Sequence, residues 1–202
     1  LGEVNELWIE ARRDRPGAEV LAELDEGTRE RIAELRALPP ERFDEVGWTP
    51  AGQAPYLEFM KIRVFDSWMH EQDIRRAIGR PGHTSGPVAE HALDRCQLAM
   101  GFAVGKQAAA PDGASVVFDL SGGAPRRFGV VVEGRARVVT PDDLSDDLLS
   151  DPTVRLTMDA ETFWCLGGGR WDPDTAMADG RVGIDGDTEL GERVVRSLNF
   201  MI

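Results

Sequence analysis

The stretch Val64–Gly82 reads VFDSWMHEQDIRRAIGRPG and carries the first of only three histidines in the 202-residue chain. Within it, His70 lies four residues after Asp66 and three before Asp73. Each residue of an α-helix turns by about 100°, so residues three and four apart are neighbours on one face. The stretch therefore predicts part of a long helix over Pro55–Ile78, with an Asp–His–Asp face, ended by its Gly-Arg-Pro-Gly sequence.

Apolar side chains lie on both sides of this predicted helix, on the side of His70 and on the opposite side: Phe59, Ile62, Val64, Trp68 and Met69. A helix that is apolar on both sides is predicted to be central and largely buried. Buried carboxylates and a buried imidazole are costly unless they are paired or bind a metal. The residues alone leave three interpretations open: a solvated histidine, a structural hydrogen bond from His70 to Asp73, and a metal or acid–base site.

Outside this stretch, helical patterns occupy the first half of the chain and strand patterns the second. Apolar spacing predicts further helices over Leu1–Arg13, Ala18–Leu38 and Pro87–Gly105, with an irregular segment over Arg42–Gly52. Short β-branched runs predict strands over Ser115–Leu120, Arg127–Glu133, Ala136–Thr140, Thr153–Met158 and Arg181–Ile184, and helices over Asp159–Leu166 and Asp187–Leu198. We therefore predict a helical-bundle domain over residues 1–110 and a small α+β domain over residues 111–202.

The composition restricts the classes of partner. A net charge of −13 repels phosphate backbones, so we expect no nucleic-acid partner. No run approaches the roughly 18 apolar residues of a membrane span, so we expect no membrane partner. Cys96 and Cys165 lack CxxC spacing, which excludes a disulfide framework and a zinc knuckle, and we expect both to be small buried hydrophobes. No signal peptide is visible, so we expect a cytoplasmic protein.

A second candidate site is the glycine run LGGGRW over Leu166–Trp171. Its backbone amides and the Arg170 guanidinium could hold a carboxylate, or the run could be a flexible turn with a solvated arginine. No Lys-Ser/Thr follows it, so it is not a phosphate loop. His91 and Asp94 are three apart and could form another half-site, although a solvated helix face is the default interpretation.

The run WMHEQDIR over Trp68–Arg75, followed by the Gly-Arg-Pro-Gly of residues 79–82, resembles the signature of the mycothiol-dependent maleylpyruvate isomerase family. The segment RVGIDGDTELGERVVRSL over Arg181–Leu198 is also similar to that family, and the resemblance covers nearly the whole chain. It implies an α+β protein in which a DinB-like four-helix bundle, whose first helix is possibly incomplete here, binds a metal. A small sterol-carrier-like α+β domain follows the bundle.

In that family, one histidine of an N-terminal helix and a Glu-x-x-x-His pair of a later helix hold the metal. Asp66 and His70 match the pair, with a carboxylate that reaches about 1.5 Å less far than glutamate. The third ligand is expected upstream of Leu1. The resemblance thus implies Asp66 and His70 as ligands of a divalent metal, most simply zinc. It implies Asp73 as the support of His70, and Arg170 as the arginine that the family uses in catalysis.

The resemblance implies a metal-dependent enzyme with mycothiol or a related thiol as cofactor. The metal would lower the pKa of the thiol, and isomerisation or thiol S-transfer on a small electrophilic substrate would follow. The alternative is a non-catalytic module that binds a small molecule or a partner and keeps a degenerate metal site. The replacement of glutamate by Asp66 favours this alternative.

Overall fold

The computed structural model describes residues 2–50, 52–140 and 150–200, and its chain divides into two compact units, Leu1–Met60 and Lys61–Ile202. The first unit contains α1 (Gly2–Glu10), α2 (Gly17–Ala37), the 3₁₀ turn η1 (Pro40–Asp44), β1 (Val46–Thr49), β2 (Gly52–Pro55) and the start of α3 (Tyr56–Ala77). The predicted helices of this region are present with small shifts at their ends, as is usual for helix boundaries.

The segment predicted to be irregular contains a short antiparallel hairpin instead. Trp48 pairs with Gln53 and Thr49 with Gly52, and the Thr49 hydroxyl donates a hydrogen bond of 2.8 Å to the Gly52 carbonyl. Each strand has only four residues. That length is too short for a period-two pattern to stand out in the sequence, which explains the wrong prediction.

The second unit continues α3 and adds the helices that lie before the sheet in the chain: α4 (Pro87–Leu98), α5 (Met100–Phe102) and the π-helical turn η2 (Ala103–Gln107). The loop between α3 and α4 is held onto α3 by two side chains. The Trp68 indole donates a hydrogen bond of 2.9 Å to the His83 carbonyl, and the Gln72 amide donates one of 3.3 Å to the Gly82 carbonyl. Part of the signature stretch therefore has a structural role.

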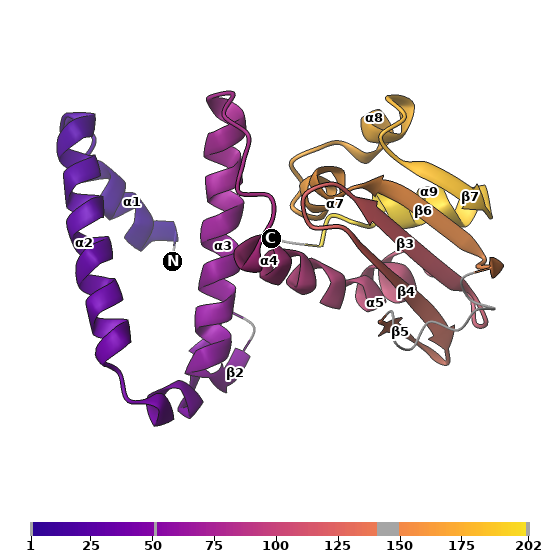
Figure 1. The fold of residues 1–202 in the computed structure, drawn as a ribbon, viewed down its shortest axis with the longest axis horizontal. Helices are drawn as coiled ribbons and strands as arrows, with labels where there is room; N and C mark the ends of the chain where they lie inside the picture. The colour runs from indigo at the N-terminus through magenta and orange to yellow at the C-terminus, as the bar shows by residue number, and fades with distance from the viewer. Residues whose placement is uncertain (1, 51, 141–149, 201–202) are drawn as a thin grey trace. The chain divides into compact units, whose positions relative to one another are not determined.

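A five-stranded sheet with the order β5-β4-β3-β6-β7 forms the rest of this unit (Figure 1). The central strands β3 and β6 are parallel, and the other neighbours are antiparallel. Its strands are β3 (Ser115–Ser121), β4 (Arg126–Glu133), β5 (Arg135–Val139), β6 (Val154–Asp159) and β7 (Gly183–Gly186), and its helices are α7 (Ala160–Gly167), α8 (Pro173–Ala178) and α9 (Thr188–Arg196).

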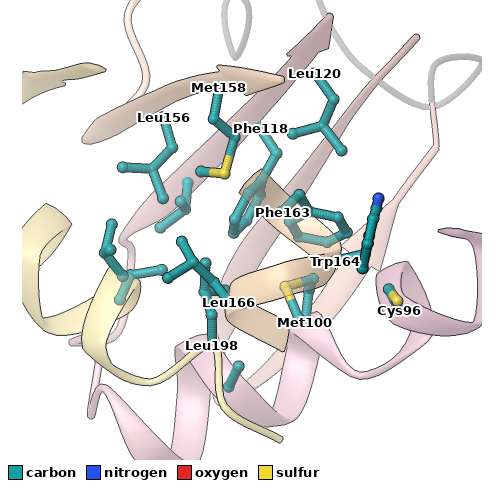
Figure 2. Close-up of a cluster of buried hydrophobic side chains, with 14 of the residues drawn as sticks. Cys96, Met100, Phe118, Leu120, Leu156, Met158, Phe163, Trp164, Leu166 and Leu198 are labelled. Carbon is teal, nitrogen blue, oxygen red and sulfur yellow. The ribbon is translucent and has the colours of Figure 1, made fainter. Parts of the chain in front are cut away.

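Aromatic rings fill the space between the sheet and α7 (Figure 2). Phe118 and Phe128 stack with centroids 4.8 Å apart, and Phe163 meets each of them edge-on at 6.0 Å. All three side chains are fully buried. Cys96 and Cys165 are also buried and free, as predicted. This core holds α7 rigidly, and with it the loop that follows α7.

The predicted fold class is confirmed: a helical N-terminal region precedes a sheet-containing C-terminal domain, and the whole is α+β. The boundary near residue 110 stays a prediction. The sequence reading missed α8, whose six residues are too few for a helical period to be recognised. No helix in the described part of the chain is long and apolar enough to cross a membrane.

A glycine contact between η2 and β5 provides a test of this packing. A Cβ on Gly105 would overlap the Cβ of Ala136, so Gly105→Ala should lower the free energy of unfolding by about 1–3 kcal/mol. Gly27→Ala is the matched control, because Gly27 lies within α2 with open space around it and should gain about 0.5–1 kcal/mol. Equal effects in urea titrations would contradict the close approach of η2 to β5.

Candidate functional site

Helix α3 brings the three predicted side chains together on one face. The Nε2 atom of His70 lies 3.5 Å from Oδ1 of Asp66, and the Nδ1 atom lies 3.8 Å from Oδ2 of Asp73. Neither distance is a hydrogen bond. The imidazole therefore stands between two carboxylates without being tied to either.

The expectation that this face is buried is wrong. The side chains of His70, Asp66 and Asp73 are 66%, 44% and 33% exposed. The only buried residues of α3 are Trp68, Met69 and Gln72, whereas apolar positions such as Ile74 are exposed. These partly exposed side chains do not need a metal to offset the cost of buried charge. Only the distances between them can indicate a metal site.

The geometry of Asp66 and His70 fits two ligands of one tetrahedral metal. Bonds of about 2.0–2.1 Å at tetrahedral angles place neighbouring ligand atoms about 3.3–3.4 Å apart, close to the observed 3.5 Å between Nε2 and Oδ1. Arg63 donates a hydrogen bond of 3.0 Å to the other oxygen of Asp66, which leaves Oδ1 facing His70. Among the described residues, no group of three or more potential ligands could hold a metal, so the pair does not form a metal site by itself.

Asp73 is engaged by an arginine from a distant part of the chain. Arg170, 97 residues away, donates from Nε to Oδ1 at 3.2 Å and from Nη2 to Oδ2 at 2.9 Å. Arg76 donates to Oδ1 from the next turn of α3 at 2.5 Å. The hydrogen bond from Arg170 is the main cause that holds the pKa of Asp73 below its ordinary value, against the opposing effect of partial burial. Asp73 is therefore a permanent anion at neutral pH.

The glycine run after α7 allows this pairing. A Cβ on Gly168 would lie 2.7 Å from Nη1 of Arg170 and 2.9 Å from Cε of Met69, and Gly169 has a φ of +63°. The Gly168 carbonyl accepts a hydrogen bond of 2.7 Å from Nη1 of Arg170. The left-handed φ of Gly169 favours glycine, and the absence of a side chain on Gly168 leaves room for the side chains of Arg170 and Met69. Arg170 is consequently paired and three-quarters buried, which rules out a solvated arginine on a flexible turn.

Arg76 connects the same cluster to the hydrophobic core. Its guanidinium lies 4.9 Å from the centroid of the Trp164 ring and donates a hydrogen bond to the sulfur of Cys165. Trp164 meets Trp68 edge-on at 5.4 Å. Burial raises the pKa of Cys165 to about 12, so this thiol stays protonated at neutral pH. The cysteine is thus a packing residue beneath the site.

The sequence analysis does not include Arg76 among the site residues. Its position three residues after Asp73 on a predicted helix indicates that the two side chains are neighbours. The half-site suggested for His91 and Asp94 does not form. Nε2 of His91 lies 2.9 Å from the Lys61 carbonyl, and Asp94 is bound by Arg126 at 2.6 Å. The other exposed histidine, His83, is hydrogen-bonded to a glutamate of α3.

Comparison with known families matches both parts of the chain. The model described as the mycothiol maleylpyruvate isomerase N-terminal domain matches residues 1–75. The model of the corresponding C-terminal domain matches residues 90–193, which is more than half of the chain. The chain belongs to the mycothiol maleylpyruvate isomerase family. No curated protein matches the chain.

Several solved structures of sterol carrier proteins resemble the chain weakly. Domain 2 of the Helicoverpa armigera sterol carrier protein is 17% identical, with 58% of this chain and 96% of that chain covered and a TM-score of 0.44. Apo sterol carrier protein 2 of Yarrowia lipolytica is 13% identical, with coverages of 55% and 93% and a TM-score of 0.38. Scores this low carry no argument about the ligand or the activity of this family member.

The lowered pKa of Asp73 predicts a pH-dependent contribution to stability. At neutral pH, Asp73→Asn should lower the free energy of unfolding by about 1–3 kcal/mol, because two guanidinium groups lose their anion. The wild-type advantage is complete above the unfolded carboxyl pKa of about 4 and is lost as pH falls through the lower folded pKa.

Urea unfolding of both proteins at neutral and at strongly acidic pH measures this difference. Asp25→Asn is the matched control, since Asp25 and Arg29 form an exposed ion pair within α2 whose loss should cost less than about 1 kcal/mol. A difference between wild type and Asp73→Asn that stays constant with pH would contradict the assignment.

Proposed function

We propose that this chain is a metal- and mycothiol-dependent enzyme that acts on a small electrophilic substrate bearing a carboxylate. The observation that carries the proposal is the position of Asp73 on α3. Its carboxylate is hydrogen-bonded to Arg170 and lies 3.8 Å from the imidazole of His70. A candidate metal-binding pair and an anchored arginine are thereby adjacent. Family membership supports this combination.

Asp66 and His70 are the residues proposed to hold the divalent metal, with zinc as the simplest choice because it accepts mixed oxygen and nitrogen ligands. The pair supplies two ligands, so the proposal requires a third from outside the described residues. When bound, the metal and mycothiol supply a thiolate at neutral pH, since coordination lowers the pKa of a thiol. The exposure of both side chains leaves room for the further ligand and for the thiol.

Arg170 is proposed to bind the carboxylate of the substrate. Its three contacts use one N–H on each of its nitrogens, which leaves one N–H on Nη1 and one on Nη2. Two N–H groups are the number that a carboxylate accepts when an arginine binds both of its oxygens. Together with Arg76 and Arg63, Arg170 makes the cluster positive in a strongly acidic chain, which favours an anionic substrate there.

Asp73 is proposed to orient Arg170. It also faces Nδ1 of the His70 ring, the nitrogen that is not proposed to bind the metal. A guanidinium held by two hydrogen bonds needs no rearrangement when negative charge develops on the substrate, so it can stabilise that charge as it forms. This arrangement serves isomerisation about an activated double bond and thiol S-transfer equally well. We propose a cytoplasmic location, in which the buried thiols of Cys96 and Cys165 remain reduced.

Metal content distinguishes this proposal from the non-catalytic alternative. Elemental analysis of the full chain should find bound zinc or another divalent metal, and His70→Ala should lose it, because the remaining ligand set is too small. His83→Asn is the matched control: His83 lies outside the pair, and asparagine tolerates its φ of +56°. Metal-free protein after purification in added zinc would exclude the enzyme, and metal retained by His70→Ala would exclude the ligand assignment.

The role of Arg170 is tested by turnover of maleylpyruvate and of an electrophilic dye with mycothiol. Arg170→Met should reduce kcat/KM by at least about 100-fold, because it removes the guanidinium that binds the substrate carboxylate together with its ion pair to Asp73. The metal content should stay unchanged, because Asp66 and His70 remain in place. Arg137→Met, on the exposed edge strand β5, should retain full activity. Unchanged turnover in folded Arg170→Met would reject the role proposed for this residue.

A further inference from the structure

The hairpin of β1 and β2 has one edge whose hydrogen-bonding groups are free. Tyr56 donates a backbone hydrogen bond of 2.9 Å to Glu45, the residue directly before β1. Bonded and non-bonded pairs alternate along an antiparallel ladder, so the register turns the backbone N–H and C=O groups of Val46 and Trp48 away from β2. Among the described residues, none bonds to these groups. β1 is therefore an open strand edge to which another strand can pair.

The opposite edge of the hairpin is partly blocked. The outward positions of β2 are Gln53 and Pro55, which lie opposite Trp48 and Val46 in the register. Proline has no N–H, so it cannot donate to a further strand at that position. β1 contains neither proline nor a charged residue, the two features with which proteins commonly protect a strand edge. A strand that extends this sheet would therefore pair with β1.

A hollow of about 340 Å³ in the first unit provides space beside β1. All four residues of β1 line it, whereas Ala54 alone lines it among the described residues of β2. Its other walls come from the end of α2, from η1 and from the start of α3. The hollow therefore follows β1 on the side of its open edge, where a further strand would lie.

The residues with the free backbone groups also carry exposed apolar side chains. Val46 is 70% exposed and Trp48 is 62% exposed. Residues two apart in a strand lie on the same face of the sheet, so the two side chains are neighbours. A strand that pairs with β1 is stabilised most when it places apolar side chains directly opposite these two.

A second copy of β1 meets this requirement. Antiparallel pairing about a two-fold axis at Gly47 sets Val46 of each copy opposite Trp48 of the other copy. Each of these two pairs exchanges two backbone hydrogen bonds, and each joins an aromatic to a β-branched side chain, a favourable cross-strand pair. Gly47 lies opposite its own copy in a non-bonded pair, where the strands approach most closely and no side chain interferes.

We propose that the chain pairs with a second copy of itself through β1. The two hairpins then form one four-stranded sheet, with Val46 and Trp48 of both copies on one face. A two-stranded hairpin is marginally stable, and three or more strands with an apolar face are more stable. The interface is small, so the pairing is transient, with a dissociation constant on the order of 100 µM. This self-association goes beyond the proposed function, since no metal, thiol or turnover enters it.

Sedimentation equilibrium of the full chain between about 10 µM and about 1 mM tests the pairing, because this range spans the expected dissociation constant. The weight-average mass should rise with concentration from that of one chain towards twice that value. Val46→Pro and Trp48→Ser should each weaken the association at least about tenfold. Val46→Pro removes an outward N–H and leaves the bonds to β2 intact, since Glu45 already has the extended ψ of 126° that a following proline requires. Trp8→Ser is the matched control, because Trp8 is an exposed tryptophan of α1.

A cross-link tests the register of the two strands. A Cβ on Gly47 would meet no atom within 4 Å, so Gly47→Cys is accommodated. At the two-fold axis, the two introduced thiols lie opposite each other at a separation that suits a disulfide. Oxidation should therefore link two copies at least about tenfold faster than in Gly27→Cys, whose thiol lies at an open position of α2. Cys96 and Cys165 are buried and do not compete.

A chain that stays monomeric up to about 1 mM would leave the edge of β1 to some other extended segment and would overturn the proposal. Association that is unchanged in Val46→Pro or in Trp48→Ser would also overturn it, because the contact would then lie elsewhere. Cross-linking of Gly47→Cys no faster than that of Gly27→Cys would reject the pairing about Gly47. Metal content and turnover do not enter any of these measurements, so the proposed function is judged separately.

Discussion

The two-point ion pair between Asp73 and Arg170 is the interaction on which the site depends. It joins α3, which carries Asp66 and His70, to the loop after α7 across 97 residues of sequence. Arg76 extends the pair into the core by its contacts with Trp164 and Cys165. Because α7 is fixed by buried aromatic rings, the position of Arg170 is fixed as well. The candidate chemistry is therefore built on a rigid support.

The signature stretch has two kinds of residue with different roles. Trp68 and Gln72 face inward and bind the carbonyls of the loop after α3, so they preserve the local fold. Asp66, His70 and Asp73 lie on the more exposed face, where a ligand can reach them. The signature thus combines residues that stabilise the fold with residues of the candidate site. Substitutions within it should be interpreted according to the face they alter.

Much of the fold was predictable from the sequence, because helix and strand periods are local. The same locality predicted that Asp66, His70 and Asp73 share a face. The prediction that this face is buried was wrong, because apolar residues of α3 such as Ile74 are exposed even though Trp68 is buried. The partner of Asp73 could not be predicted, because nothing local relates α3 to a glycine run 97 residues later. The resemblance proposed Arg170 as a functional residue, and only the structure identified Asp73 as its partner.

The central claim is that the metal pair and Arg170 form one site. Substoichiometric Mn²⁺, a paramagnetic ion with similar ligand preferences to other hard divalent metals, tests this directly in the full chain. The account predicts that NMR signals of His70 and of the Arg170 Nε–H broaden first and together, and that His70→Ala abolishes the effect. Broadening centred on another acidic surface, or broadening at His70 without any at Arg170, would contradict the account.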